Sequence, residues 1–159
     1  MVIILVKSLS WQIIDTPQFQ RLRDLHQNGC SYFVFPSATH KRFEHSLGTA
    51  HLCNELMKDL KLKQPELNIR ENDIINVTIA GLCHDLGHGP FSHSFENCMN
   101  TILHNTENNH KFDHEEKSTE LLEYLIKQNK IEISSDDLSF IQCLIKGEGA
   151  QNYNENLSK

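Results

Sequence analysis

The central segment of the chain reads Gly81-Leu82-Cys83-His84-Asp85-Leu86-Gly87-His88-Gly89-Pro90-Phe91-Ser92-His93. It closes a run of apolar side chains, starting after Asn72, that would cover most of the circumference of a helix, so this helix is expected at the centre of the fold. Asn72 is a candidate N-cap, and Gly87 with Gly89-Pro90 ends the pattern abruptly. A His-Asp pair therefore stands at the end of an apolar helix, where burial is costly unless both side chains have partners.

A divalent cation is one of the few groups that satisfies a buried imidazole and a buried carboxylate at once. Imidazole nitrogen combined with carboxylate oxygen suits zinc, iron, manganese or a similar metal far better than calcium. His45 belongs to the preceding expected helix, and an antiparallel arrangement of the two helices would bring it to His84 and Asp85. A single His-Asp pair also fits a hydrogen-bonded structural role, so both interpretations stand at this point.

Helical periodicity runs through almost the whole sequence. Apolar residues at helix spacing predict helices over 17–28, 41–60, 72–86, 92–103, 114–129 and 136–146. The aromatic and β-branched stretch 32–36 is expected as a short extended segment or a packed loop, and 105–111 as a polar loop. No internal repeat or linker divides the chain. We therefore expect an all-α fold with one core over 1–147 and a polar tail over 148–159.

Composition excludes several functional classes. The 159 residues include 15 Lys and Arg against 21 Asp and Glu, a net charge of −6, which argues against general binding to nucleic acid or to an anionic membrane. No apolar stretch approaches the roughly 20 residues of a membrane helix, and Met1–Val6 is too short for a secretory signal, so an intracellular protein is expected. The five cysteines lack zinc-ribbon or thioredoxin spacing and are expected to be reduced, buried thiols.

The ten histidines stand out in the composition. Most of those other than His45 and His84 are interpreted by their position in the sequence. A glycine separates His88 from His84, so His88 and His93 are expected to face a substrate from a loop rather than to bind the metal. Arg42 lies near the start of the helix over 41–60, where it fits either a surface charge or a phosphate-binding role beside a metal. The sequence leaves His40 open and favours surface positions for His26, His51, His104 and His110.

Two motifs point to a family. The first is Arg42-Phe43-Glu44-His45-Ser46-Leu47-Gly48, and the second is His84-Asp85, which follows His45 by 39 residues. Together they resemble the HD-domain phosphohydrolase superfamily. Two further segments narrow the resemblance: Gly81 to His93, and Asp15-Thr16-Pro17-Gln18-Phe19-Gln20-Arg21-Leu22-Arg23. They resemble the deoxynucleoside triphosphate triphosphohydrolases, in the eukaryotic branch that carries a sterile-alpha-motif domain before the HD domain. It extends from Ile13 to Gly147.

The resemblance implies an all-α HD-domain helical bundle with a divalent metal, which would be zinc, iron, manganese or magnesium. It implies hydrolysis of deoxynucleoside triphosphates of the dGTP type to a deoxynucleoside and inorganic triphosphate. Three of the family's four metal ligands match His45, His84 and Asp85. The catalytic residues near the scissile α-phosphate match His88, His93, Glu96 and His114.

The resemblance also implies contacts with nucleotides. Arg42 matches an arginine on the substrate phosphates, and Gln27 matches a glutamine at the deoxyribose end. Asp15, Gln20 and Arg23 match family residues that bind an activating guanine nucleotide between the subunits of a homo-oligomer. Placement in the nucleus rather than the cytoplasm would rest on this resemblance alone.

The sequence departs from the family pattern at several points. Glu96 stands where the family has an aspartate, and Asn28 replaces an apolar residue. The fourth metal ligand, an aspartate, lies in the family beyond the point that matches Gly147, and 148–159 resembles nothing there. We therefore expect a truncated HD domain, inactive or weakly active alone. Two alternatives stay open: an inactive fragment that binds guanine nucleotide or associates with full-length subunits, and an HD-domain phosphohydrolase acting on another nucleotide.

Overall fold

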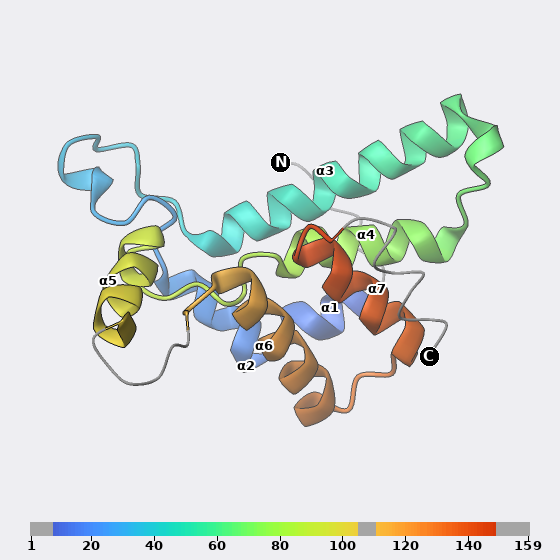
Figure 1. The fold of residues 1–159 in the computed structure, drawn as a ribbon. Helices are drawn as coiled ribbons and strands as arrows, with labels where there is room; N and C mark the ends of the chain where they lie inside the picture. Colours follow the sequence, from blue (N-terminus) through green and yellow to red (C-terminus); the bar gives the residue numbers. More distant parts are fainter. Residues whose placement is uncertain (1–7, 105–110, 149–159) are drawn as a thin grey trace.

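The structure, a computed structural model, describes residues 8–104 and 111–148 (Figure 1). Within these ranges the chain forms helices and no β-strand, so the predicted all-α fold is confirmed. The α-helices are α1 (Ser8–Ile14), α2 (Pro17–Gln20), α3 (Arg42–Lys63), α4 (Glu71–Cys83), α5 (His93–His104), α6 (His114–Asn129) and α7 (Ser135–Ile145). The 3-10 helices are η1 (Arg21–Asp24), η2 (Ser31–Phe33) and η3 (Pro65–Leu67). None of the described helices has the length and apolar character needed to span a membrane.

Helix α4 lies at the centre of the fold, as its sequence predicts. It packs against α3, α6 and α7, and its residues Ile79, Leu82 and Cys83 are completely buried. Figure 1 shows α4 running antiparallel to the long helix α3, which brings the start of α3 next to the end of α4. The two helices approach closely because Gly81 has no Cβ, and a Cβ there would lie 2.6 Å from Cys53 Sγ.

The boundaries of α4 differ from those predicted. Its N-cap is Arg70, whose backbone N–H donates to the Asp73 carboxylate at 2.8 Å. The predicted N-cap, Asn72, lies inside the helix, and its side-chain amide donates to Asp137 Oδ1 at 2.5 Å, which ties the start of α4 to α7. Because the helix ends at Cys83, the His-Asp pair stands in the turn that follows rather than inside the helix.

The segment after α1 is less helical than predicted. Its α-helix covers only Pro17–Gln20 and continues as η1, and the backbone becomes extended at Leu25. The chain leaves the helical path because Gln27 N–H donates to His40 O at 3.1 Å and Arg42 N–H donates to Leu25 O at 2.9 Å. These bonds fasten the segment to the start of α3, and a longer helix would forgo them.

Two predictions about burial are wrong. The stretch 32–36 is not extended, because η2 covers its first two residues, and most of it is not packed. Tyr32 is half-buried, but the next three side chains are exposed: Phe33, Val34 and Phe35. All five cysteines are free thiols, but Cys83 and Cys143 are buried whereas Cys30 and Cys98 are exposed. Apolar neighbours in sequence do not fix which face of a short helix carries a given side chain, so burial did not follow from them.

The two C-terminal helices agree closely with the sequence. Helix α6 has the predicted bounds, with the Asp113 carboxylate accepting from the N–H groups of Glu115 and Glu116. Helix α7 starts and ends one residue earlier than predicted, because Ser134 is its N-cap and accepts from Asp137 N–H. The predicted loop over 105–111 and tail over 148–159 lie outside the described residues, except for their members Lys111 and Glu148, as do Met1–Val6 and His110.

Two glycines should respond in opposite ways to substitution by alanine. A Cβ at Gly87 would collide with backbone atoms of His114 and Ser118 in the first turns of α6, whereas nothing lies within 4 Å of a Cβ at Gly48 in α3. We expect Gly87→Ala to lower the free energy of unfolding by about 1–3 kcal/mol. Gly48→Ala should raise it by about 0.5–1 kcal/mol. Urea unfolding followed by circular dichroism measures both, and equal effects would contradict this packing.

Candidate active site

His45, His84 and Asp85, here called the candidate metal centre, converge where α3 begins and α4 ends. Nε2 of His45 lies 3.2 Å from Nε2 of His84 and 3.3 Å from Oδ2 of Asp85. Nε2 of His84 lies 3.3 Å from Oδ1 of Asp85. The antiparallel pairing of α3 and α4 produces this arrangement, since His45 lies in the first turn of α3 and the other two residues follow α4 directly.

The donor set of the candidate metal centre fits a divalent transition metal. Ligand atoms bound at about 2.0–2.2 Å lie about 3.0–3.4 Å from one another, which is the spacing found here. Nδ1 of His84 lies 2.8 Å from Gly81 O, so the ring donates its proton there and leaves Nε2 to the other two groups. The side chains of His45 and His84 are about one third exposed, so the group is open to solvent and could hold a metal ion.

Arg42 is the buried counter-ion of Asp85. Its Nη1 donates to Asp85 Oδ2, and the two side chains are only 2 % and 8 % exposed. Burial lowers the pKa of Arg42, and the Asp85 carboxylate opposes this shift. The predicted phosphate-binding arginine thus lies beside the candidate metal centre with one of its donors already used by Asp85. Its Nε is buried and has no hydrogen-bond partner in the part of the chain that the structure describes.

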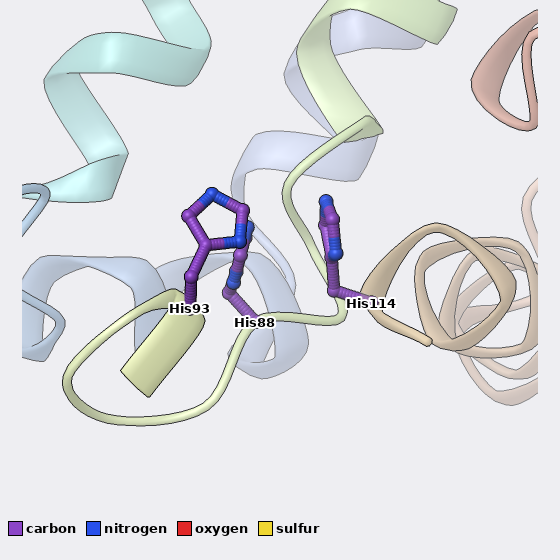
Figure 2. Close-up of side chains that lie close together, drawn as sticks. All are labelled: His88, His93 and His114. Carbon is purple, nitrogen blue, oxygen red and sulfur yellow. The ribbon is translucent and has the colours of Figure 1, made fainter. Parts of the chain in front are cut away.

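Figure 2 shows a second group of side chains, His88, His93 and His114, here called the histidine cluster. It lies next to the candidate metal centre. His88 stacks on His114 with ring centroids 4.1 Å apart, and His93 meets these two rings edge-on at 5.0 and 5.2 Å. Glu96 Oε2 lies 3.0 Å from His114 Nδ1 and 3.4 Å from His93 Nδ1. The structure therefore brings the four predicted catalytic residues together from the loop after α4, from α5 and from α6. His88 Nε2 lies 3.5 Å from Asp85 Oδ1, so the two groups are in contact.

The environment keeps His88 neutral. Its side chain is 2 % exposed, and burial followed by the nearby Arg42 guanidinium lowers its pKa to about 3, although Asp85 opposes the shift. Burial likewise lowers the pKa of His45. Neutral imidazoles present a free lone pair at pH 7, as binding to a metal requires.

Arg21 supports the site in a structural role that the sequence did not indicate. From η1 it donates to two carbonyls in the loop after α4, with Nη2 2.6 Å from Leu86 O and Nη1 3.1 Å from His88 O. These bonds hold the backbone between Asp85 and His88. The available sequence signal was the position of Arg21 inside the motif over 15–23.

The predicted nucleotide-contact residues lie on two further parts of the fold. Gln20 donates through Nε2 to a carbonyl of α1 at 2.8 Å and accepts on Oε1 from Arg23 Nε at 2.6 Å, so these two side chains share one surface. Asp15 is exposed on the same segment. Gln27 is half-buried, and its backbone carbonyl accepts from Ser92 Oγ at 2.8 Å, which places it beside the loop that leads to α5.

The histidines predicted at the surface differ in their exposure. His104 is exposed as predicted, and so is His40. His51 is half-buried, and so is His26, whose ring stacks on Tyr32 at 5.0 Å and lies 2.8 Å from Lys41 Nζ. The surface prediction is therefore wrong for both His51 and His26. For His26 it did not anticipate the contacts between the segment after η1 and the start of α3.

Removal of Arg42 should destabilise the fold strongly. Arg42→Ala would leave Asp85 buried without its counter-ion, and breaking a buried pair in this way costs about 3–5 kcal/mol. The matched control is Lys63→Ala, which breaks an exposed ion pair with Asp59 and should cost less than about 1 kcal/mol. Urea unfolding of the metal-free proteins measures the difference. A loss for Arg42→Ala as small as that of the control would show that the pair contributes little.

Acid should destabilise the metal-free protein through His88. Its folded-state pKa of about 3 lies below the unfolded value of about 6.5, so the unfolded chain binds more protons in between. The free energy of unfolding therefore falls as the pH drops from about 6.5 toward 3, by roughly a few kcal/mol. Urea unfolding in EDTA measures this dependence. It should flatten in His88→Gln and persist in the control His104→Gln, and an unchanged dependence in His88→Gln would contradict the assignment.

The sequence of this chain is similar to sequences of known proteins. Deoxynucleoside triphosphate triphosphohydrolase SAMHD1 of Gallus gallus is 50% identical over 144 residues, which cover 86% of this chain and 23% of that protein. The SAMHD1 homolog of Dictyostelium discoideum is 49% identical over 136 residues, covering 85% of this chain and 26% of that protein. For SAMHD1 of Homo sapiens the identity is 48% over 144 residues, with coverages of 86% and 22%.

The chain spans about a quarter of the length of these curated relatives. Residues 42–148 match the HD domain family, a range that includes the candidate metal centre and the histidine cluster. Because this match extends over more than half of the sequence, the chain belongs to the HD-domain family.

Proposed function

We propose that this chain supplies metal-binding and phosphate-binding residues for the hydrolysis of deoxynucleoside triphosphates to a deoxynucleoside and inorganic triphosphate. The observation that carries the proposal is the contact between the two groups, in which Asp85 Oδ1 lies 3.5 Å from His88 Nε2. A phosphate bound at this contact would meet metal ligands on one side and imidazoles on the other. The substrate class follows the names of the relatives, which are deoxynucleoside triphosphate triphosphohydrolases.

The candidate metal centre would hold zinc, iron, manganese or magnesium through His45, His84 and Asp85. When bound, such an ion supplies Lewis acidity and a water with a pKa lowered to about 7. The chain's own contribution is to orient the ligands. Arg42 fixes the Asp85 carboxylate, and the Gly81 carbonyl fixes the ring of His84.

The histidine cluster would orient the substrate and protonate the leaving group. His93 is 69 % exposed at the rim, where it can donate a proton to the departing 5′-oxygen. Glu96 accepts from Nδ1 of both His93 and His114, so Nε2 of each ring is left for the substrate. His88 is neutral and would donate a hydrogen bond to a phosphate oxygen.

Nucleotide recognition is proposed at two places. Arg42 would contact the substrate phosphates through the donors that Asp85 does not use, and Gln27 would contact the deoxyribose, with dGTP as the preferred substrate. A guanine-nucleotide activator would bind between the subunits of a homo-oligomer. Its contact residues would be Asp15, Gln20 and Arg23, two of which already share one surface.

Product analysis tests the proposed function. The 159-residue protein, incubated with dGTP and manganese, should release inorganic triphosphate and deoxyguanosine, at a low rate because the chain itself brings three metal ligands. His84→Ala should lower the rate at least about 100-fold by removing a ligand. The exposed His104→Ala should leave the rate unchanged. Equal rates in the two variants would show that the turnover does not come from this site.

The nature of the product also separates the alternatives. Release of orthophosphate or pyrophosphate instead of triphosphate would indicate an HD-domain phosphohydrolase of another specificity. Binding of GTP without any turnover, abolished by Arg23→Ala, would indicate a non-catalytic nucleotide-binding chain that associates with complete subunits. Either result would replace the proposed activity.

A further inference from the structure

Three imidazoles from separate elements meet at one point in the histidine cluster (Figure 2). His88 comes from the loop after α4, His93 opens α5 and His114 opens α6. Each offers a ring nitrogen, and these three atoms lie within 4.8 Å of one another. None of the three is a predicted metal ligand. We propose that the histidine cluster is itself a transition-metal site, separate from the candidate metal centre.

Glu96 prepares two of the rings for this role. Its Oε2 lies 3.0 Å from Nδ1 of His114 and 3.4 Å from Nδ1 of His93. A carboxylate that accepts the Nδ1 proton fixes the tautomer and leaves the Nε2 lone pair free, which is the usual arrangement around metal-binding histidines. Glu96 is 15 % exposed, so its position is set by its surroundings. The cluster thus contains three candidate ligands and the residue that orients them.

The donor set defines the class of ion. Three imidazole nitrogens suit zinc, cobalt, nickel or copper, whereas magnesium and calcium prefer oxygen ligands. Ligand nitrogens at about 2.0–2.1 Å from zinc lie about 3.3–3.4 Å apart, so the rings must draw closer than their present spacing. His93 can supply this movement, because its side chain is 69 % exposed.

The site differs from the candidate metal centre in its donors and in its consequence. The candidate metal centre combines two imidazoles with a carboxylate, whereas the histidine cluster offers imidazoles alone. An ion held by the cluster would occupy the nitrogens that a substrate phosphate would otherwise meet, so it would inhibit hydrolysis. This consequence rests on the proposed function, whereas binding of the ion does not.

Zinc titration of the untagged, chelator-treated 159-residue protein tests the proposal without any measurement of turnover. Calorimetry should show two equivalents of zinc for the wild type. His93→Ala and His45→Ala should each bind one equivalent, because each disables a different site. Glu96→Gln should weaken one of the two equivalents about 10- to 100-fold. The control His104→Ala should bind two equivalents with unchanged affinities, and excess magnesium should not displace the equivalent that persists in His45→Ala.

Several outcomes would overturn the proposal. These are two equivalents retained in His93→Ala, no binding in His45→Ala, or a single equivalent in the wild type that His93→Ala retains. Circular dichroism of each variant verifies folding, and His93 is exposed enough for its loss to leave the fold intact. Activity is measured separately, with dGTP and manganese and without zinc. Two equivalents of zinc in the titration together with no triphosphate release in that zinc-free assay would support the site and refute the proposed function, so the two failures can be told apart.

Discussion

Arg42 and Asp85 can occupy the interior because they are paired there. An isolated carboxylate or guanidinium so deeply buried would cost several kcal/mol, and each supplies the opposite charge that the other lacks. The pair joins the first residue of α3 to the second residue after α4. Once this junction is fixed, His45 and His84 must face each other, since one follows Arg42 by three residues and the other precedes Asp85. The geometry of the candidate metal centre is therefore a consequence of one ion pair and two helix directions.

The loop that carries the site is held by bonds to its backbone. Arg21 donates to the carbonyls of Leu86 and His88, and Ser118 of α6 donates to His84 O while accepting from Gly87 N–H. These bonds fix the path of the chain through its backbone atoms, and they do not use the imidazole nitrogens. This arrangement requires glycine at position 87, because the backbone of α6 lies too close for any side chain there. The loop thus acts as a support for the side chains of the candidate metal centre and of the histidine cluster.

The sequence predicted the features that depend on local periodicity. The bounds of α6 and the central position of α4 follow from apolar repeats and capping residues, and the meeting of His45 with His84 follows from antiparallel neighbours. It could not predict the short α2 and η1, because bonds between Leu25 and Arg42 redirect that segment from a distance. For the same reason the contacts of Arg21 were not foreseen, since they join residues more than sixty positions apart. Long-range hydrogen bonds carry no periodic signal.

Burial gives the three imidazoles of the histidine cluster different chemical properties although their residue type is the same. His88 is 2 % exposed, His114 19 % and His93 69 %. The innermost ring cannot gain a proton at neutral pH, because burial and Arg42 lower its pKa to about 3. The outermost ring is in contact with solvent. In the proposed reaction, the leaving group would therefore take its proton from His93, whereas His88 would bind and orient the phosphate. This division follows from the depth of each side chain, which is set by where α5 and α6 begin.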